Sequence, residues 1–578
     1  GMYGAGTTHI SGDASMPQVT ANKILQRRLE VSGTFDADNN YWLYVQNGGA
    51  LHLTSTATLR STTHEGHIYF AANSEVPSGS QGVTLFSADA GATVDVADGL
   101  TLRLFSDNNL GNQFSARLNV TGAGALALTG GRFTLEGDSV IGGTGTFNLL
   151  NTDLLGSGNL TLRDNFNWLS GNMGGAGRTV LDTSITLSGT RVIDRELVIA
   201  EGRTLLLNDN GVLRGSSSTA GGGRLTGLGT LAKGEGSGNA YLQYLDISGN
   251  IQSRGGVLRL HGYSDGQGAS IGGMVVSSLN GGGVLLESST FNIAGQPLAI
   301  AADSTLQMSA GTIHLDGAPI TGAGTFLVSG GTLLVNADSA ITSRFTLSGG
   351  TLAGAADFTI GNAFDWSGGT MAGDGRTVFA AGTMATIGSA SNYKFLHRRL
   401  DVAGTLTFSN STNYDLYIRD GGTLHLGATG TLATSGNAYL YMNEGFNSAG
   451  NGLAQLSSAA GGRVVVTEGN SLFISADGSS NNVIGGSFLL TGPGVVQQTA
   501  GTLTADLATQ INGAGLLRVS GGTFAATAAT GIAQLELSGG LLDAARPHVK
   551  TLHRLPIHAL AVHHHCGTRA AGPTRGRF

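Results

Sequence analysis

The chain is poor in the residues that most protein classes need in quantity. Of its 578 residues, 12% are charged and 6% are aromatic, and there are 8 prolines and one cysteine, Cys566. A single cysteine excludes an intrachain disulfide framework, and so little proline excludes a collagen-like chain. No apolar run approaches the ~18 residues of a membrane-spanning helix, so we expect no membrane span. The core must therefore come from small aliphatic and β-branched side chains.

Glycine is abundant, at 95 positions, and the formal net charge is −7. Residues 544–578 hold six Lys or Arg and no Asp or Glu, which leaves residues 1–543 with 25 basic and 38 acidic groups, a balance of −13. Nucleic-acid-binding proteins usually show a basic face. The acidic body therefore disfavours nucleic acid as a partner.

Self-comparison shows a long internal repeat. Segments that begin with x-Gly-Ala-Gly align without gaps at separations of 200 and 191, namely residues 121–133, 321–333 and 512–524. A Phe-x-Trp block at residues 166–180 aligns with residues 364–378 at an offset of 198, and residues 27–33 resemble residues 398–404. A repeat of about 195 residues follows, present in three imperfect copies.

A shorter period lies inside the long one. Ser-Gly-Gly recurs at residues 329 and 348 and again at residues 520 and 538, spacings of 19 and 18. Between the glycines, runs such as Gly422-Thr-Leu-His-Leu426 alternate apolar with polar residues, the pattern of half-buried strands. Gly-Gly, Asn-Gly and Asp-Gly pairs supply the positive φ angles of sharp corners.

These periods predict an all-β fold, a right-handed parallel β-helix (β-solenoid) with coils of about 19 residues. Propeller blades and sandwich domains repeat over ~40–100 residues, so the short period disfavours both. A coil this short cannot bury its own apolar face and must stack on its neighbours. We expect an N-terminal segment or cap at residues 1–20 and a continuous β-helix at residues 21–543.

The repeat pattern breaks after Asp543. Residues 544–578 contain 6 of the 14 histidines, 3 of the 8 prolines and the only cysteine. The Phe-x-Trp block expected near residue 556 is replaced by Pro556-Ile-His-Ala. We interpret residues 544–578 as a non-repeat tail that is disordered or that arises from a frame-shift or other sequence error, with a native C-terminal arm as the alternative.

The Gly-Thr-Leu and Ser-Gly-Gly-Thr-Leu units, the alternation rich in Thr, Asn and Gly, and the near absence of cysteine resemble the β-helical shafts of bacterial exported surface proteins. Filamentous haemagglutinin-like adhesins and autotransporter passenger domains are the nearest examples. The resemblance covers residues 20–543 and rests on the style of the repeats. It implies an extracellular or cell-surface location.

Aromatic residues are the candidate ligand contacts. Trp168 and Trp366 each follow a phenylalanine by two residues, which places both on one face of a strand and predicts a core position. A looser group of aromatic residues is a candidate for glycan contact, because aromatic rings can stack on sugars: Tyr41, Trp42, Tyr44, Tyr414 and Tyr417.

Charged residues show no pattern that identifies a catalyst or a metal site. Arg27-Arg28 and Arg398-Arg399 are predicted to lie on solvated corners beside Glu30 and Asp401. His52 and His425 stand between inward leucines and should point outward. The run His563 to Cys566 is a weak zinc candidate, and we predict no metal site and no cofactor.

We therefore expect an exported bacterial surface stalk or adhesin-like protein whose polar β-helical surface binds glycans or host or matrix proteins. The alternative is a β-helical enzyme that processes polysaccharides, a lyase or hydrolase. Such an enzyme needs paired carboxylates at a suitable separation. Asp36 with Asp38, and Asp194, Glu196 and Glu201, are the available candidates.

Overall fold

A computed structural model shows the architecture of the chain. It describes residues 1–16, 21–38, 41–71, 82–216, 221–263, 265–388, 392–409, 416–443, 452–506, 508–526, 529–544 and 548–554. The chain divides into two compact units, Gly1–Phe326 (unit 1) and Leu327–Phe578 (unit 2). Each unit is all-β, and the described residues contain no helix.

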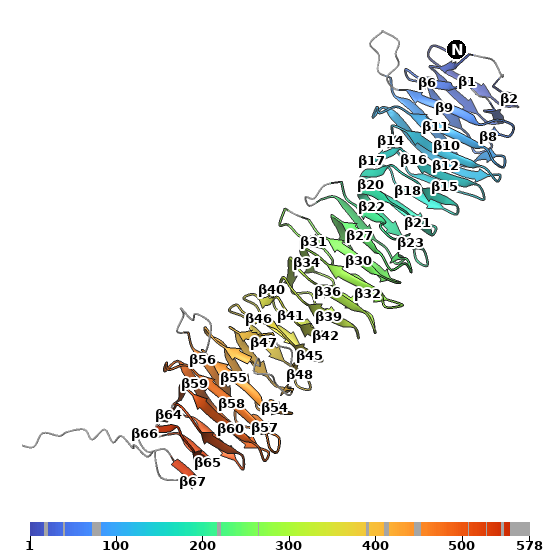
Figure 1. Ribbon diagram of the computed structural model, residues 1–578. Coiled ribbons are helices and arrows are strands. Elements are labelled where there is room, and N and C mark those ends of the chain that lie inside the picture. Colours follow the sequence, from blue (N-terminus) through green and yellow to red (C-terminus); the bar gives the residue numbers. More distant parts are fainter. Residues whose placement is uncertain are drawn as a thin grey trace, which may run out of the picture. The chain divides into compact units, whose positions relative to one another are not determined.

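The fold is a parallel β-solenoid of about 23 turns, as the repeats predict. Each coil carries three short strands, and most strands pair in parallel with their counterparts in the neighbouring coils (Figure 1). We number the three faces of a coil in chain order. Some long strands pass through a corner and belong to two faces.

The strands of unit 1 up to residue 182 build the three faces as follows. Face 1 holds β3 (Lys23–Leu25), β6 (Leu43–Gln46), β9 (Gly66–Ala71), β11 (Thr101–Ser106), β13 (Ala125–Gly130), β16 (Thr146–Leu150) and β19 (Phe166–Trp168). Face 2 holds β1 (Thr7–Ile10), β4 (Arg28–Val31), β7 (Ala50–Leu53), β14 (Arg132–Leu135) and β17 (Asp153–Gly156), and face 3 holds β2 (Ala14–Ser15), β5 (Thr34–Asp36), β8 (Thr58–Ser61), β15 (Ser139–Gly142) and β18 (Leu160–Arg163). The strands β10 (Thr84–Val96), β12 (Asn112–Thr121) and β20 (Asn172–Asp182) span faces 2 and 3.

The same pattern continues through the rest of unit 1. Its strands are β21 (Ile185–Leu187), β22 (Thr190–Ile199), β23 (Thr204–Leu207), β24 (Val212–Arg214), β25 (Gly223–Thr226), β26 (Thr230–Lys233), β27 (Asn239–Gln243), β28 (Leu245–Ile247), β29 (Gly249–Ser253), β30 (Val257–His261), β31 (Ala269–Ser270), β32 (Met274–Ser278), β33 (Gly283–Leu286), β34 (Thr290–Ala294), β35 (Leu298–Ile300), β36 (Thr305–Met308), β37 (Thr312–Asp316) and β38 (Ile320–Thr321). The unit boundary falls within β39 (Thr325–Val328).

Unit 2 begins with regular coils and ends with longer ones. The regular part holds β40 (Thr332–Ala337), β41 (Ser339–Ile341), β42 (Arg344–Leu347), β43 (Thr351–Ala353), β44 (Phe358–Ile360), β45 (Phe364–Trp366), β46 (Gly369–Met371), β47 (Arg376–Phe379) and β48 (Met384–Ile387). The later part holds β49 (Lys394–Leu396), β50 (Arg399–Val402), β51 (Thr405–Phe408), β52 (Leu416–Ile418), β53 (Thr423–Leu426), β54 (Thr431–Thr434), β55 (Ala438–Met442), β56 (Ala454–Ser458), β57 (Arg463–Val466), β58 (Ser471–Ala476), β59 (Asn482–Thr491), β60 (Val495–Ala500), β61 (Thr502–Ala505), β62 (Gln510–Gly513), β63 (Leu516–Val519), β64 (Thr523–Ala526), β65 (Gly531–Leu537), β66 (Leu541–Ala544) and β67 (His548–Arg554).

Coil length varies more than the sequence period indicates. The mean is near 22 residues rather than the predicted 19. In the regular part of unit 2, Thr332 pairs with Thr351, which is a coil of 19 residues. Farther on, Leu424 pairs with Leu456, a coil of 32. The Ser-Gly-Gly motifs lie in the shortest coils, so their spacing gives the minimum coil length. The other coils are longer because they carry insertions at the corners.

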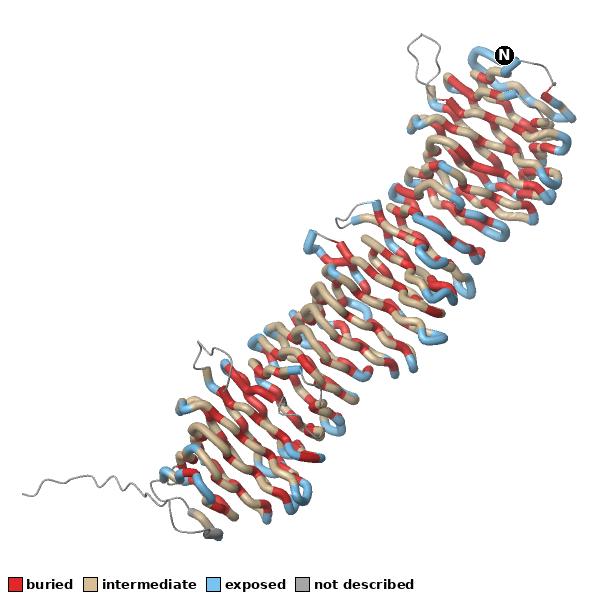
Figure 2. Tube along the Cα trace, viewed as in Figure 1, coloured by how far each residue is buried: buried red, intermediate tan, exposed pale blue. Residues whose placement is uncertain are grey.

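Inward side chains fill each coil with aliphatic and aromatic groups. Buried residues alternate with more exposed ones along nearly every strand (Figure 2). Trp168 and Trp366 are 2% and 0% exposed, so their predicted core positions are confirmed. Aromatic residues of successive coils stack inside the solenoid. Phe147 lies 5.6 Å from Phe166 between ring centroids.

Glycines at the x-Gly-x-Gly corners are required by the close approach of the coils. Gly122, Gly322 and Gly513 have φ angles of 79°, 103° and 101°. A Cβ atom at these positions would lie 2.0–2.1 Å from a carbonyl oxygen of the preceding coil. Both the backbone angle and the contact exclude a side chain, as the repeat of these glycines predicted.

Two buried arginines hold corners together at equivalent places in the two units. Arg398 is 1% exposed and donates to the carbonyl oxygens of Ala356, Ala372 and Gly375. Arg195 makes the same kind of contact with the oxygens of Gly158, Gly174 and Arg178. Burial lowers the pKa of each guanidinium to about 10.

The prediction that Arg398 lies on a solvated corner is therefore wrong. A composition-based expectation places arginine outside, but three carbonyl oxygens at a tight corner need donors, and the guanidinium supplies five N–H groups. Its neighbour Arg399 is exposed and pairs with Asp401 as predicted, at 2.7 Å. Arg28 likewise pairs with Glu30, at 3.1 Å.

Strand pairing extends past Asp543. The strand β67 pairs with β65 through contacts such as Gly531 with His548 and Leu537 with Arg554. Residues 555–578, including the His563 to Cys566 run, lie outside the described residues. The interpretation of residues 544–578 as a sequence error concerns the encoding DNA and stays a prediction.

Candidate functional site

Two segments of the solenoid resemble each other in sequence and strand arrangement, and they contain the aromatic residues predicted to contact glycans. Segment N comprises residues 23–121 of unit 1, and segment C comprises residues 394–491 of unit 2. Lys23-Ile-Leu-Gln-Arg-Arg-Leu29 corresponds to Lys394-Phe-Leu-His-Arg-Arg-Leu400. The ten-residue strands β12 and β59 occupy equivalent places, and each ends at a Thr-Gly-x-Gly corner.

In segment N, aromatic side chains cover the outer surface of face 1. Tyr44 on β6 and Trp42, which directly precedes this strand, are half-buried, and Tyr41 is exposed. The parallel register places Tyr44 beside Tyr69 of β9, and Tyr69 beside Phe105 of β11. The neighbours along the sheet therefore come from three consecutive coils.

The rings of this group meet at steep angles. We define aromatic cluster N as Trp42, Tyr44, His67, Tyr69 and Phe105. The ring centroid of Trp42 lies 4.6 Å from that of Phe105 at 73°, and 4.9 Å from that of His67 at 56°. Tyr44 meets Tyr69 at 5.3 Å and 60°. Edge-to-face contacts are one favoured arrangement of aromatic pairs, and two rings that meet in this way do not lie flat on each other.

Charged groups border aromatic cluster N. Glu65 accepts hydrogen bonds from the Arg103 guanidinium, with Oε1 3.1 Å from Nη2. The Nε2 atom of His67 lies 3.6 Å from Glu65 Oε2. The Lys23 ammonium lies 5.8 Å from the ring centroid of Tyr41, a cation–π distance. Apolar faces and hydrogen-bonding groups therefore occur side by side on this surface.

In segment C, the equivalent surface carries a different arrangement of rings. Tyr417, the counterpart of Tyr44, is only 7% exposed. We define aromatic ladder C as the face 1 aromatic residues Phe395, Tyr417, Tyr439, Tyr441 and Phe473, together with Tyr393 directly before the segment. Tyr417 stacks on Tyr441 at 4.5 Å and 14°, and Tyr439 stacks on Phe473 at 4.8 Å and 25°.

Stacking of this kind turns the ring faces toward one another along the ladder. Arg419 adds a cation–π contact with Phe395 at 5.8 Å. Tyr414, the remaining predicted glycan-contact residue, lies outside the described residues. Of the five predicted residues, the structure thus brings Tyr41, Trp42 and Tyr44 together in unit 1 and places Tyr417 inside a ladder in unit 2.

Sequence reasoning missed most members of both groups. Tyr69 and Phe105 are 25 and 61 residues from Tyr44 in the chain, because the intervening coils carry long insertions. A usable signal was present in the alternation of His67-Ile-Tyr-Phe70 and Ala438-Tyr-Leu-Tyr441, which marks Tyr69, Tyr439 and Tyr441 as outward. The coil lengths needed to align them were not evident.

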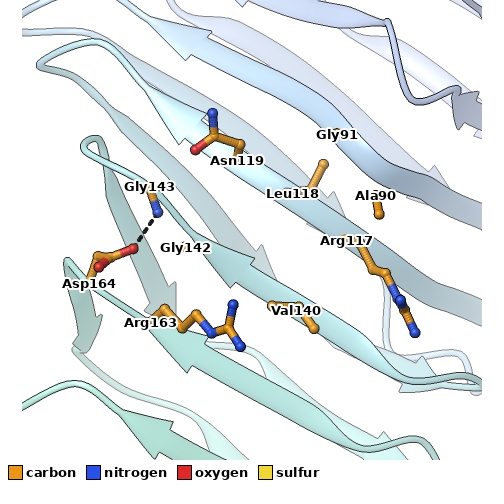
Figure 3. A pocket seen from close by; sticks show the side chains of 10 residues that line it. All are labelled: Ala90, Gly91, Arg117, Leu118, Asn119, Val140, Gly142, Gly143, Arg163 and Asp164. Carbon is orange, nitrogen blue, oxygen red and sulfur yellow. Dashed lines mark hydrogen bonds between the residues drawn. The ribbon is translucent and has the colours of Figure 1, made fainter.

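A second feature of segment N is a hollow along the corner between faces 2 and 3. One part has a volume of about 510 Å³ and is lined by residues that include His52, Ser87, Asp89, Ser115 and Arg117. The adjoining part, of about 490 Å³, shares Arg117 (Figure 3). It extends to Arg163 and Asp164, whose carboxylate accepts a hydrogen bond from Gly143 N–H at 2.8 Å.

The two outward histidines each contact a serine of the next coil. His52 Nδ1 lies 2.9 Å from Ser87 Oγ, and His425 Nδ1 lies 2.9 Å from Ser457 Oγ. In segment N, His52 Nε2 also lies 3.5 Å from Asp89 Oδ2. The corresponding position in segment C is Ala459. The prediction that both histidines point outward is confirmed.

Four of the five carboxylates considered for a polysaccharide-processing enzyme have structural partners. Asp36 accepts two hydrogen bonds from Arg60, at 2.7 and 2.8 Å. Asp38 binds the backbone N–H groups and hydroxyls of Thr62 and Thr63. These two aspartates are engaged in cross-coil contacts.

Two of the three carboxylates in the other candidate set are arranged in the same way, and the third, Glu201, is exposed. Asp194 accepts from Ser216 N–H at 2.7 Å, and Glu196 from Thr226 Oγ1 at 3.0 Å. Within the residues that the structure describes, no three His, Cys, Asp or Glu side chains gather as metal ligands. The same residues include no helix long and apolar enough to cross a membrane.

Comparison of the chain with protein-family models, with curated proteins and with solved structures finds no match.

Proposed function

We propose that this chain belongs to an exported bacterial surface protein, an adhesin-like stalk that binds glycans through aromatic cluster N. The solenoid fold supports the stalk, because parallel strand pairing along a coil stack gives an extended, regular surface. The resemblance of its repeats to β-helical adhesin and autotransporter shafts supports the surface location. The binding half of the proposal depends on the aromatic cluster.

The observation that carries the proposal is the tilted packing of Trp42, Tyr44, Tyr69 and Phe105 on the outside of three consecutive coils. Sugar rings present C–H groups that pack on the electron-rich faces of aromatic rings. Strands of adjacent coils are ~4.8 Å apart, so β6 and β11 are separated by roughly 10 Å. A glycan chain lying along the coil stack would meet an aromatic ring on each coil.

The polar border completes such a site. Binding sites combine apolar and aromatic surface with a few well-placed polar groups that fix the orientation of the ligand. Glu65, Arg103 and His67 stand next to the rings and offer hydrogen-bond donors and acceptors for hydroxyl groups. Segment C, with its stacked ladder, is assigned a structural role in this proposal.

A glycan array probed with the whole chain tests the function, with a matrix-protein array run in parallel. We expect the chain to bind at least one class of glycan, and Trp42→Ala to weaken that binding at least ~10-fold, since an aromatic platform residue dominates such sites. Absence of glycan binding, or a Trp42→Ala variant that binds like the original chain, would overturn the glycan half of the proposal. Binding to matrix proteins alone would replace glycans with proteins as the partner.

A further inference from the structure

A histidine, a serine and an aspartate lie in contact at the corner hollow of segment N. His52 is on β7 and Ser87 is on β10, directly opposite in the parallel register. Ser87 Oγ is 2.9 Å from His52 Nδ1, and Asp89 Oδ2 is 3.5 Å from His52 Nε2. The His52 side chain is 13% exposed and that of Asp89 is 57% exposed.

The backbone explains why Asp89 can reach the histidine. The strand β10 turns from face 2 to face 3 at Asp89, Ala90 and Gly91, which leave the ladder between the pairs Ala88–Ala116 and Ala92–Leu118. Gly91 has a φ of 107°, an angle that glycine adopts at no steric cost. The extruded corner brings the Asp89 carboxylate back over β7.

We propose that Ser87, His52 and Asp89 form a hydrolytic site for short-chain carboxylic esters of polar alcohols. Ser87 is the nucleophile, His52 is the general base and Asp89 is the positioning residue. An imidazole with its proton on Nε2, directed at the Asp89 carboxylate, keeps Nδ1 free to accept the Ser87 hydroxyl proton. A serine activated by an adjacent base that is itself oriented by a third group is the arrangement that nucleophilic catalysis requires.

The reaction balances with water as the only co-reactant. Ser87 Oγ adds to the ester carbonyl carbon while its proton passes to His52. The ester C–O bond then breaks, and the alcohol leaves with that proton. Water attacks the acyl-serine with His52 again as the base, which releases the carboxylic acid and restores Ser87. The guanidinium of Arg117 lines the hollow and supplies a positive charge for the oxyanion in this proposal.

The size and the lining of the hollow determine which class of ester it can hold. Its volume of about 510 Å³ suits a small acyl group, and Ala88 and Ala90 supply its apolar lining. Ser115, Arg117 and Asp138 supply polar groups for the alcohol portion. This site is separate from aromatic cluster N, so its activity does not depend on glycan binding.

Segment C is a matched control within the same chain. His425 and Ser457 reproduce the first contact at the same 2.9 Å. Gly461, the counterpart of Gly91, has a φ of 101°. The sequence there has Ala459 in place of Asp89 and Ser487 in place of Arg117. The His–Ser pair is therefore common to both segments, whereas Asp89 and Arg117 are replaced by uncharged residues in segment C.

The experiment uses the whole chain, p-nitrophenyl acetate as the substrate and a fluorophosphonate probe whose attachment site is found by mass spectrometry. We expect hydrolysis of the ester, labelling at Ser87 and none at Ser457. Ser87→Ala should abolish both signals, whereas Ser457→Ala should leave both unchanged. Labelling of neither serine, or equal labelling of both, would overturn the proposal.

The role of Asp89 is tested separately, with substitutions at an exposed side chain that leave the coil interior untouched. Asp89→Asn should slow labelling of Ser87 at least ~100-fold, the lower end of the range typical of general acid–base contributions. Asp89→Glu keeps the carboxylate and should label within a few-fold of the original chain. An Asp89→Asn chain that labels at the original rate, or an Asp89→Glu chain as slow as Asp89→Asn, contradicts the assignment.

Discussion

Segments N and C share their interior and differ on their outside. Leu51 and Leu424 are both fully buried at equivalent places on β7 and β53, and Gly91 and Gly461 turn equivalent corners. On the outer surface, tilted rings around Trp42 stand where segment C has a stacked ladder. The sequence has Asp415 at the position of Trp42. The coil repeat thus fixes the backbone positions and the buried residues, whereas the outward residues differ between the two segments.

Substitutions in the shared interior should sharpen this comparison, and they have the largest expected effect. Leu51→Ala and Leu424→Ala should each lower the free energy of unfolding by about 2–5 kcal/mol, because each leaves a cavity in a close-packed coil. Urea denaturation followed by circular dichroism measures both. A cost below ~1 kcal/mol for one of the two would show that the interiors are not equivalent.

The equivalent arginines Arg27 and Arg398 differ in burial, so their substitution should affect the two segments differently. Arg398 is buried against three carbonyl oxygens, whereas its counterpart Arg27 is only half-buried. Arg398→Met should cost about 3 kcal/mol, because buried carbonyl groups lose charged donors. Arg27→Met should cost less, under ~1 kcal/mol. Equal losses in urea denaturation would mean that the corner clamp does not contribute to stability.

The tyrosines on face 1 should separate the ladder from the cluster. Tyr417 is 7% exposed and stacked on Tyr441, so Tyr417→Ala should cost about 2 kcal/mol. Tyr44 is more exposed, and Tyr44→Ala should cost roughly half as much. The melting temperatures of the two variants, measured by thermal unfolding, give the stability that each one loses. A larger loss of stability in Tyr44→Ala than in Tyr417→Ala would contradict the structural role proposed for aromatic ladder C.

Acidification should give the smallest effect. Burial, with a further contribution from Arg399, lowers the pKa of His425, while Asp401 opposes the shift. Because the folded pKa lies below the unfolded value, the unfolded chain binds more protons, and stability falls as the pH drops below ~6.5. Going from about pH 7.5 to about pH 5.5 should therefore lower the melting temperature less in His425→Gln than in the original chain. A variant more sensitive to acid than the original chain would reverse the sign of this contribution.

Much of the architecture was predictable because the repeat imposes it. The glycine corners, the alternating strands and the buried Trp168 and Trp366 follow from local patterns. Coil length did not follow, because the Ser-Gly-Gly spacing samples only the tightest coils. The burial of Arg398 depends on carbonyl oxygens from two other coils, which no local pattern reveals.

The candidate sites were predictable only in part. The sequence marked both Tyr44 and Tyr417 as candidate glycan contacts, but their different burial depends on the rings of neighbouring coils. The contact between His52 and Ser87 joins residues 35 apart, and that between His425 and Ser457 joins residues 32 apart. Such pairs form where the coils carry insertions, so the sequence period alone does not bring them into register.

The central claim is that the outer surface of segment N binds glycans while that of segment C supports the fold. The most direct test measures the affinity of the whole chain for a glycan identified on the array, alongside Trp42→Ala and the ladder variant Phe473→Ala. The account predicts a loss of at least ~10-fold for Trp42→Ala and an unchanged affinity for Phe473→Ala. Unchanged affinity for Trp42→Ala, or an equal loss in both variants, would contradict it.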